Sequence, residues 1–266
     1  MSFKKTSTYK SFINSKYLCL KYNNYFEVYD ELLKEYRNKK IIFVEIGVFS
    51  GGSLFMWRNY FGKKARIIGI DLNPETKQFE KYGFEVFIGD QSKKSFWKNF
   101  FKKIGKVDVV LDDGGHTNYQ QIMTTNQCIP MINDNGKMII EDIHTSYIKK
   151  KFYNPSKFSF INYSKKIIDD INTRFPVIKN FNYSLNKFIY KIQFFESIVC
   201  FDINRKLCNQ NKLISNHKKT INPNEFRSFL DKKSLFYKLK KSFGLKTNFT
   251  FLNFLINSFK LKKYFN

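Results

Sequence analysis

The sequence predicts an α/β protein with a doubly wound, mostly parallel sheet, and three observations predict this fold. Between Ile41 and Ile143, short apolar runs rich in β-branched residues alternate with longer segments whose apolar residues have helical spacing. The connections between them are short, as in right-handed βαβ units. Acids and glycines directly follow several apolar runs, at the positions where open parallel sheets bind ligands.

Five strands and three helices are expected in this region. The run "IIFVEIG" is apolar almost throughout, as expected for a strand covered by helices on both faces. The strands are predicted at 41–47, 66–72, 85–90, 106–113 and 136–143, and the helices at 52–61, 92–104 and 118–132. In the second of these helices, Phe96, Phe100 and Ile104 form one apolar stripe.

Further elements are expected on both sides of this region. A helical segment containing "FEVYDELLKEYRNK" precedes it, and a helix at 160–175 follows it. The stretch 189–204 reads as two strands around Glu196 and Ser197, which would close the far edge of a seven-stranded sheet. We therefore expect an N-terminal helical cap at 1–40, a core at 41–204 and a helical tail at 205–266.

Positive charge is concentrated in that tail. Residues 205–266 carry 15 Lys and Arg against 2 Asp and Glu, about half of the net charge of +25. Its amphipathic basic helices could pack on the domain or in a homo-oligomer, or could attach peripherally to the inner face of an anionic membrane. Nucleic acid is the least favoured partner, because Lys, Asn, Ile, Phe and Tyr, which are abundant together, share AT-rich codons.

The rest of the composition favours a cytoplasmic protein. No run of eighteen apolar residues occurs, and the N-terminus lacks the apolar core of a signal peptide. The four cysteines have no CxxC spacing, which favours reduced thiols over disulfides or a metal site.

The first predicted strand ends in a glycine loop, "EIGVFSGGS". Glycines there let the backbone approach a ligand closely and turn into a helix. The spacing is not GxGxxG and no Walker lysine follows, so a dinucleotide or a nucleoside triphosphate is disfavoured. The pattern Glu-x-Gly-x-x-x-Gly instead resembles class I S-adenosylmethionine (SAM) methyltransferases. The resemblance implies SAM contacts from this loop, through Glu45, Gly47, Ser50, Gly51 and Ser53.

Acids at the next strand ends extend this resemblance. Asp71 ends the second strand, where a carboxylate can accept hydrogen bonds from both hydroxyls of a ribose. In "IGDQS", the resemblance places Asp90 and Gln91 beside the adenine of SAM. Asp112, at the end of the fourth strand, would also lie near the cofactor. Any one of these acids could equally be a turn former or a helix cap.

Two neighbouring strand ends, "LDDGGH" and "IIEDIHTSY", bring acids and histidines to the same edge. Four carboxylates placed close together raise one another's pKa values unless a cation compensates them, and a hard divalent cation is the usual solution. The residues in question are Asp112, Asp113, His116, Glu141, Asp142 and His144.

Residues 22–147 resemble bacterial sugar O-methyltransferases of the macrocin and mycinamicin type. The resemblance implies that Asp113, Glu141 and Asp142 hold Mg²⁺ and that His116 is the general base. Two departures are Gly115, where serine is common, and "HTSY" after the acid pair, which adds His144 as an alternative base or substrate contact. Two other interpretations stay open. His116 could act without a metal, or the turn and the acid pair could be purely structural.

The expected activity is methyl transfer from SAM to a hydroxyl group of a sugar that is nucleotide-linked or glycan-bound. The alternatives are transfer to a carboxylate or nitrogen without metal, and a non-catalytic SAM-binding partner subunit. An RNA methyltransferase is disfavoured, because Asp-Asp-Gly-Gly-His stands where a base-reading Asn-Pro-Pro-Tyr motif would follow the fourth strand.

Overall fold

A computed structural model describes residues 2–148, 157–175, 185–208 and 211–219, and further on residues 242, 258, 261–262 and 264. The chain divides into two compact units, residues 1–212 and 213–266. The predicted tail at 205–266 lies largely outside the described residues, so its role stays a prediction. Within the described part, no helix is both long enough and apolar enough to span a bilayer.

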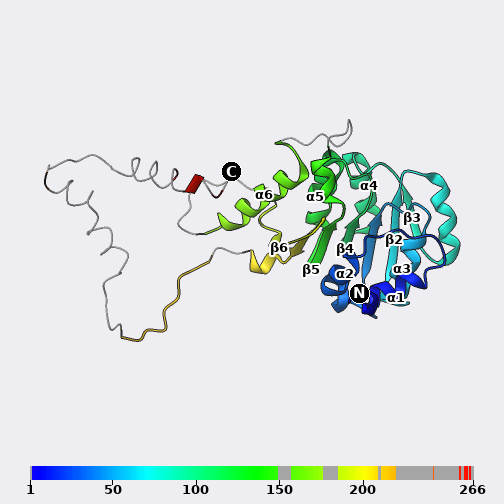
Figure 1. Ribbon diagram of the computed structural model, residues 1–266, viewed down its shortest axis with the longest axis horizontal. Coiled ribbons are helices and arrows are strands. Elements are labelled where there is room, and N and C mark those ends of the chain that lie inside the picture. Colours follow the sequence, from blue (N-terminus) through cyan, green and yellow to red (C-terminus); the bar gives the residue numbers. More distant parts are fainter. Residues whose placement is uncertain are drawn as a thin grey trace. The chain divides into compact units, whose positions relative to one another are not determined.

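Seven strands form one sheet in the first unit, as the sequence predicts (Figure 1). Their order is β3-β2-β1-β4-β5-β7-β6, with β1 to β5 mutually parallel and β7 antiparallel to both neighbours. The bounds are Ile42–Ile46 (β1), Arg66–Asp71 (β2), Glu85–Ile88 (β3), Val107–Asp112 (β4), Ile132–Ile140 (β5), Ile189–Phe195 (β6) and Ile198–Ile203 (β7).

The described helices also follow the predicted pattern, with small shifts in their ends. They are Ser7–Ile13 (α1), Tyr25–Leu33 (α2), Gly52–Phe61 (α3), Lys94–Ile104 (α4), Asn118–Cys128 (α5) and Phe160–Asn172 (α6). The helix predicted at 118–132 ends four residues early, because Pro130 has no N–H for an α-helical hydrogen bond and sits in a short 3₁₀ turn. β5 accordingly begins at Ile132, where the sequence alone predicted 136.

Two apolar layers hold helices against the sheet. One joins α1, α2 and α3 to one face through side chains such as Phe43 and Trp57, and the other joins α4, α5 and α6 to the opposite face through Val44 and Trp97. Phe43 and Val44 are consecutive in β1 and both fully buried, because successive strand residues point to opposite faces. Burial on both faces explains why the central strands are continuously apolar.

The direction of chain progression reverses between β1 and β4, which pair directly in the middle of the sheet. From β1 the chain continues to β2 on one side, and from β4 it continues to β5 on the other. The loops that follow β1 and β4 therefore separate at the carboxyl edge and leave a crevice there, as in other doubly wound sheets.

Candidate functional site at the carboxyl edge of the sheet

A cavity of about 900 Å³ opens at this crevice. Its walls come mainly from the loops after β1, β2, β3, β4 and β5, and from residues 18–22, which precede α2. The predicted site residues in its wall are Gly47, Ser50, Ser53, Asp71, Gln91, Asp113, His116, Glu141 and Asp142. The other predicted site residues do not belong to the wall that the described residues form, and they are Glu45, Gly51, Asp90, Asp112 and His144.

The glycine loop turns sharply against the turn after β4, residues 113–117, which we call the β4 turn. Gly47 has φ +91°, and a Cβ atom there would lie 2.1 Å from the backbone oxygen of Asp113. Gly51, with φ +79°, is the N-cap residue directly before α3, and a Cβ atom there would overlap the ring of Phe79. Both positions require glycine, because the backbone is left-handed and a neighbour occupies the space of a side chain.

The carboxylate of Asp71 holds this loop in place. Its Oδ2 accepts hydrogen bonds from the backbone N–H groups of Val48, at 2.8 Å, and Phe49, at 3.0 Å. Its Oδ1 accepts one from the N–H of Asn73 at 2.8 Å. Asp71 therefore ties the loops after β1 and β2 together while it lines the cavity.

Glu45 lies in the interior of the fold and not in the cavity wall. Its carboxylate is fully buried and accepts hydrogen bonds from Ser53 Oγ at 2.7 Å and Trp57 Nε1 at 2.9 Å. Burial raises the pKa of Glu45 to about 7, although Lys21 and the two hydrogen bonds oppose the rise. The acid connects β1 to α3, and its contact with a cofactor stays a prediction.

Replacing Glu45 with glutamine should remove a pH-dependent part of the stability. Because the pKa of Glu45 is about 7 in the folded chain against an ordinary 4.5, the folded state binds more protons at this group between these pH values. Its contribution to stability therefore falls as pH rises from 4.5 to 7. The quantity to measure is the unfolding free energy of Glu45→Gln minus that of the parent, from urea unfolding. We expect this difference to increase by about 3 kcal/mol between pH 4.5 and pH 8. A difference that does not change with pH would contradict this account.

Gln91 and Asp112 form a buried network beneath the β4 turn. Gln91 Nε2 donates to both carboxylate oxygens of Asp112 and to Thr124 Oγ1, each at 3.0 Å, while its Oε1 accepts from the N–H of Gly115 at 2.9 Å. Burial raises the pKa of Asp112. The side chain of Asp90 instead accepts a hydrogen bond from the N–H of Ser92. Gln91 and Asp112 therefore fix the turn that carries Asp113 and His116.

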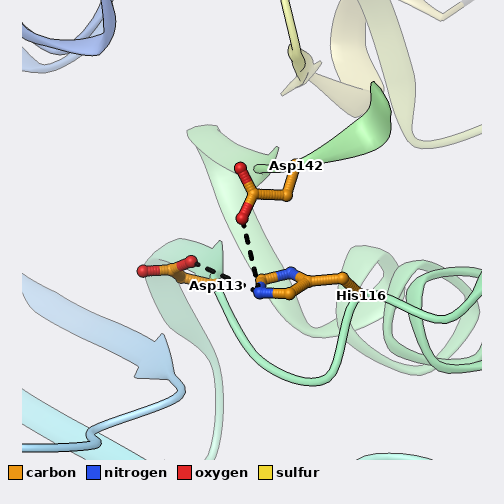
Figure 2. Close-up of side chains that lie close together, drawn as sticks. All are labelled: Asp113, His116 and Asp142. Atoms are coloured by element: carbon orange, nitrogen blue, oxygen red, sulfur yellow. Dashed lines mark ion pairs between the residues drawn. The ribbon is translucent and has the colours of Figure 1, made fainter. Parts of the chain in front are cut away.

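Asp113, His116 and Asp142 come together at the cavity wall (Figure 2). His116 Nε2 lies 3.4 Å from Asp142 Oδ2 and 3.9 Å from Asp113 Oδ1, and Figure 2 shows both carboxylates turned toward the imidazole. One ligand atom from each of the three residues lies within 4.8 Å of the others. The arrangement can hold a proton or a cation between two carboxylates.

Four of the seven described non-glycine residues with positive φ lie at this cavity or beside Asp142. His116, Asp142, Ser197 and Phe49 all have positive φ, at +56°, +55°, +63° and +47°. Such conformations cost non-glycine residues about 1–3 kcal/mol each and persist only where the surroundings enforce them. Here they turn His116 and Asp142 toward each other from two separate loops.

Lys21, which sequence reasoning missed, lies beside this cluster. Its ammonium donates to Asp113 Oδ2 at 2.6 Å and to Glu141 Oε2 at 2.9 Å, and 2% of its side chain is exposed. Burial opposes the charge of Lys21, but Asp113 and Glu141 outweigh that effect and raise its pKa well above the usual value. A single lysine in "LCLKYNN" has no motif around it, so the sequence alone offered no signal.

His144 lies behind Asp142 rather than in the cavity wall. Its Nδ1 is 2.5 Å from Ser197 Oγ, which is 2.9 Å from the hydroxyl of Tyr25. That hydroxyl donates to Asp142 Oδ1 at 2.6 Å. Burial and the bond to Asp142 raise the pKa of Tyr25. Tyr25 and Ser197 therefore support Asp142, and among the two candidate bases only His116 lines the cavity.

The chain is similar to several known methyltransferases. The model of a methyltransferase domain family matches residues 44–143. An 8-demethyl-8-alpha-L-rhamnosyl tetracenomycin-C 2'-O-methyltransferase of Streptomyces olivaceus is 26% identical over 159 residues, which cover 56% of this chain and 42% of that protein. The mycinamicin VI 2''-O-methyltransferase of Micromonospora griseorubida is 30% identical over 126 residues, covering 45% and 31%. The chain thus spans less than half the length of these relatives.

A solved structure has the same fold. The MycE methyltransferase from the mycinamycin biosynthetic pathway, in complex with Mg and SAH (S-adenosylhomocysteine), superposes with a TM-score of 0.68 at 22% identity. The match covers 86% of this chain and 60% of that one. The chain therefore has the fold of this methyltransferase, matches a methyltransferase domain over residues 44–143, and resembles the sugar O-methyltransferases of the macrocin and mycinamicin type.

Proposed function

We propose that the chain is a SAM-dependent O-methyltransferase that acts on a hydroxyl group of a nucleotide-linked or glycan-bound sugar. One observation carries the proposal. A single cavity joins the glycine loop and Asp71 to the cluster of Asp113, His116 and Asp142. The first group suits a ribose-containing co-substrate, and the second suits deprotonation of a hydroxyl. Both similar proteins of Streptomyces and Micromonospora are O-methyltransferases, one of them of a rhamnosyl compound, which supports the same chemistry.

The glycine loop and Asp71 would hold SAM. Gly47 lets the loop pack against the backbone of Asp113, and Ser50 and Ser53 add hydroxyl groups to the same wall. Asp71 keeps its carboxylate on the cavity wall, where the remaining lone pairs can accept hydrogen bonds from ribose hydroxyls. SAM would supply an electrophilic methyl group.

His116 would take the proton of the acceptor. His116 lines the cavity, and its Nε2 lies near the carboxylates of Asp113 and Asp142. These carboxylates would stabilise the imidazolium that forms. The acceptor oxygen bonds to the methyl carbon as the carbon–sulfur bond breaks, and the hydroxyl proton moves to His116, leaving S-adenosylhomocysteine. Holding the hydroxyl in line with the methyl group supplies a large part of the rate.

The donor set fits a divalent cation in part. Asp113 Oδ1 and Asp142 Oδ2 are hard oxygen ligands, and both point toward the same space beside His116. Lys21 and Tyr29 already contact the carboxylate of Glu141. Mg²⁺ would lower the pKa of an acceptor hydroxyl and orient it. Asp113 and Asp142 are the residues that would hold it.

Metal removal tests this part of the proposal directly. We expect dialysis against EDTA to abolish most methyl transfer and added Mg²⁺ to restore it, because the cation would stabilise the developing alkoxide. The measurement is transfer of label from SAM. Full activity after dialysis would show that the reaction needs no metal, and would favour transfer to a carboxylate or nitrogen, or the histidine acting alone.

Screening acceptors tests the substrate class. Labelled SAM is incubated with nucleotide sugars, glycosides with free hydroxyls and matched acceptors that offer a carboxylate or amine. We expect label in the hydroxyl acceptors and an ether linkage in the product. Labelled carboxylate or amine acceptors alone would contradict the proposal, and SAM binding without any transfer would favour a non-catalytic partner subunit.

A further inference from the structure

The three acids of the site differ in how many oxygens they leave open. Glu141 has neither free, because Lys21 donates to Oε2 at 2.9 Å and the hydroxyl of Tyr29 donates to Oε1 at 2.5 Å. Asp113 Oδ2 receives Lys21, and only its Oδ1 faces His116.

Asp142 is likewise engaged on one side. Its Oδ1 accepts the hydroxyl of Tyr25, and its Oδ2 faces His116 at 3.4 Å. The open oxygens of the site therefore belong to Asp113 and Asp142, and both lie near His116 Nε2.

We propose that the ammonium of Lys21 prevents Glu141 from acting as a metal ligand. A divalent cation would then bind only to Asp113 and Asp142. This inference rests on the proposed metal site, and it concerns a residue in the segment before α2 that the family motifs do not include. Lys21 is a positioning residue, since it acts through the two carboxylates it contacts.

Two physical arguments support this role. A buried carboxylate is costly unless a cation and hydrogen bonds compensate it, and Lys21 with Tyr29 supplies both for Glu141. A second cation in contact with the same oxygens would meet the full repulsion of an ammonium that has 2% of its side chain exposed. Divalent ions therefore find lower energy at the oxygens that Lys21 does not contact.

A double-mutant cycle tests this, with Mn²⁺ as the probe and free Mn²⁺ measured by electron paramagnetic resonance. The variants are Lys21→Met, Glu141→Gln and the combination, with Lys21→Arg retaining the charge. Lys16→Met is the matched control, because it removes an exposed lysine from the same segment without touching the carboxylates. The combination removes one charge of each sign. It therefore also tests whether Lys21→Met loses stability only because the buried carboxylate of Glu141 is left without a cation.

With Lys21 in place, Glu141→Gln should change Mn²⁺ affinity by less than about threefold, because the residue is not a ligand. Lys21→Met should tighten binding by at least about tenfold, since it frees two oxygens and removes a repulsive charge. When Glu141→Gln is added to Lys21→Met, this gain in Mn²⁺ affinity should be lost. Lys21→Arg and Lys16→Met should bind as the parent does.

Two results separate failure of this inference from failure of the proposed metal. If Glu141→Gln weakens Mn²⁺ binding about tenfold or more in the presence of Lys21, Glu141 is a ligand and the inference is wrong. If the parent binds no Mn²⁺, the metal part of the proposed function fails. A gain of binding in Lys21→Met would then still support the role of Lys21, and no gain would overturn it.

Discussion

Replacing His116 with alanine should lower the turnover number of methyl transfer at least about 10²-fold and leave the affinity for S-adenosylhomocysteine unchanged. The reason is the separation of roles in the cavity. The imidazole faces Asp113 and Asp142, whereas the glycine loop and Asp71 form a separate part of the wall. The variant should therefore keep its binding of co-substrate and lose the group that removes the proton.

The other two histidines are the controls for this variant. His217 is exposed and outside the core, so His217→Ala should behave as the parent. His144 contacts Ser197 behind Asp142, and His144→Ala should lower turnover much less than His116→Ala. Turnover and calorimetric titration with S-adenosylhomocysteine check all three variants. If His144→Ala is the more damaging change, the proton is removed by His144 and the assignment of His116 is wrong.

Most of the fold follows from local signals in the sequence. Continuous apolar runs mark β1, β2 and β4 because helices cover both faces of these strands, and the pair of strands around Ser197 is visible as two apolar runs with a polar break. The ends of α5 and β5 were misplaced. Their limits depend on the 3₁₀ turn at Pro130 and on the pairing of Ile132 with Val107, and periodicity does not show either.

The candidate site was predictable where it follows strand ends and unpredictable where it depends on distant packing. Asp71, Asp113, His116 and Asp142 each follow a recognisable strand, so topology alone brings them to one edge. Lys21 and Tyr25 reach the same place from before the first strand. The sequence also does not show in which direction a side chain at a strand end points. Glu45 and Asp112 sit at predicted strand ends, yet their carboxylates are buried among partners within the fold.

Gly47→Ala should be among the most damaging single substitutions in the domain. The new Cβ atom would lie 2.1 Å from the backbone oxygen of Asp113 and 2.8 Å from its carbonyl carbon, and backbone atoms cannot rotate away as a flexible side chain can. The left-handed φ adds strain of its own. Together these effects should cost at least about 3 kcal/mol of unfolding free energy. They should also push apart the glycine loop and the β4 turn, which both contribute residues to the cavity wall.

Gly83→Ala separates the effect of the left-handed backbone from the effect of the contact with Asp113. Gly83 has φ +81°, close to that of Gly47, but a Cβ atom there would have nothing within 4 Å. Its replacement should cost only about 1 kcal/mol, the penalty of the backbone conformation alone. Urea unfolding measures this difference, and titration with S-adenosylhomocysteine should show at least about tenfold weaker binding for Gly47→Ala alone. Equal losses of stability in both variants would mean that contact with Asp113 does not explain the need for glycine in the loop. Unchanged binding in a folded Gly47→Ala protein would place the co-substrate away from this loop and remove the basis of the proposed SAM site.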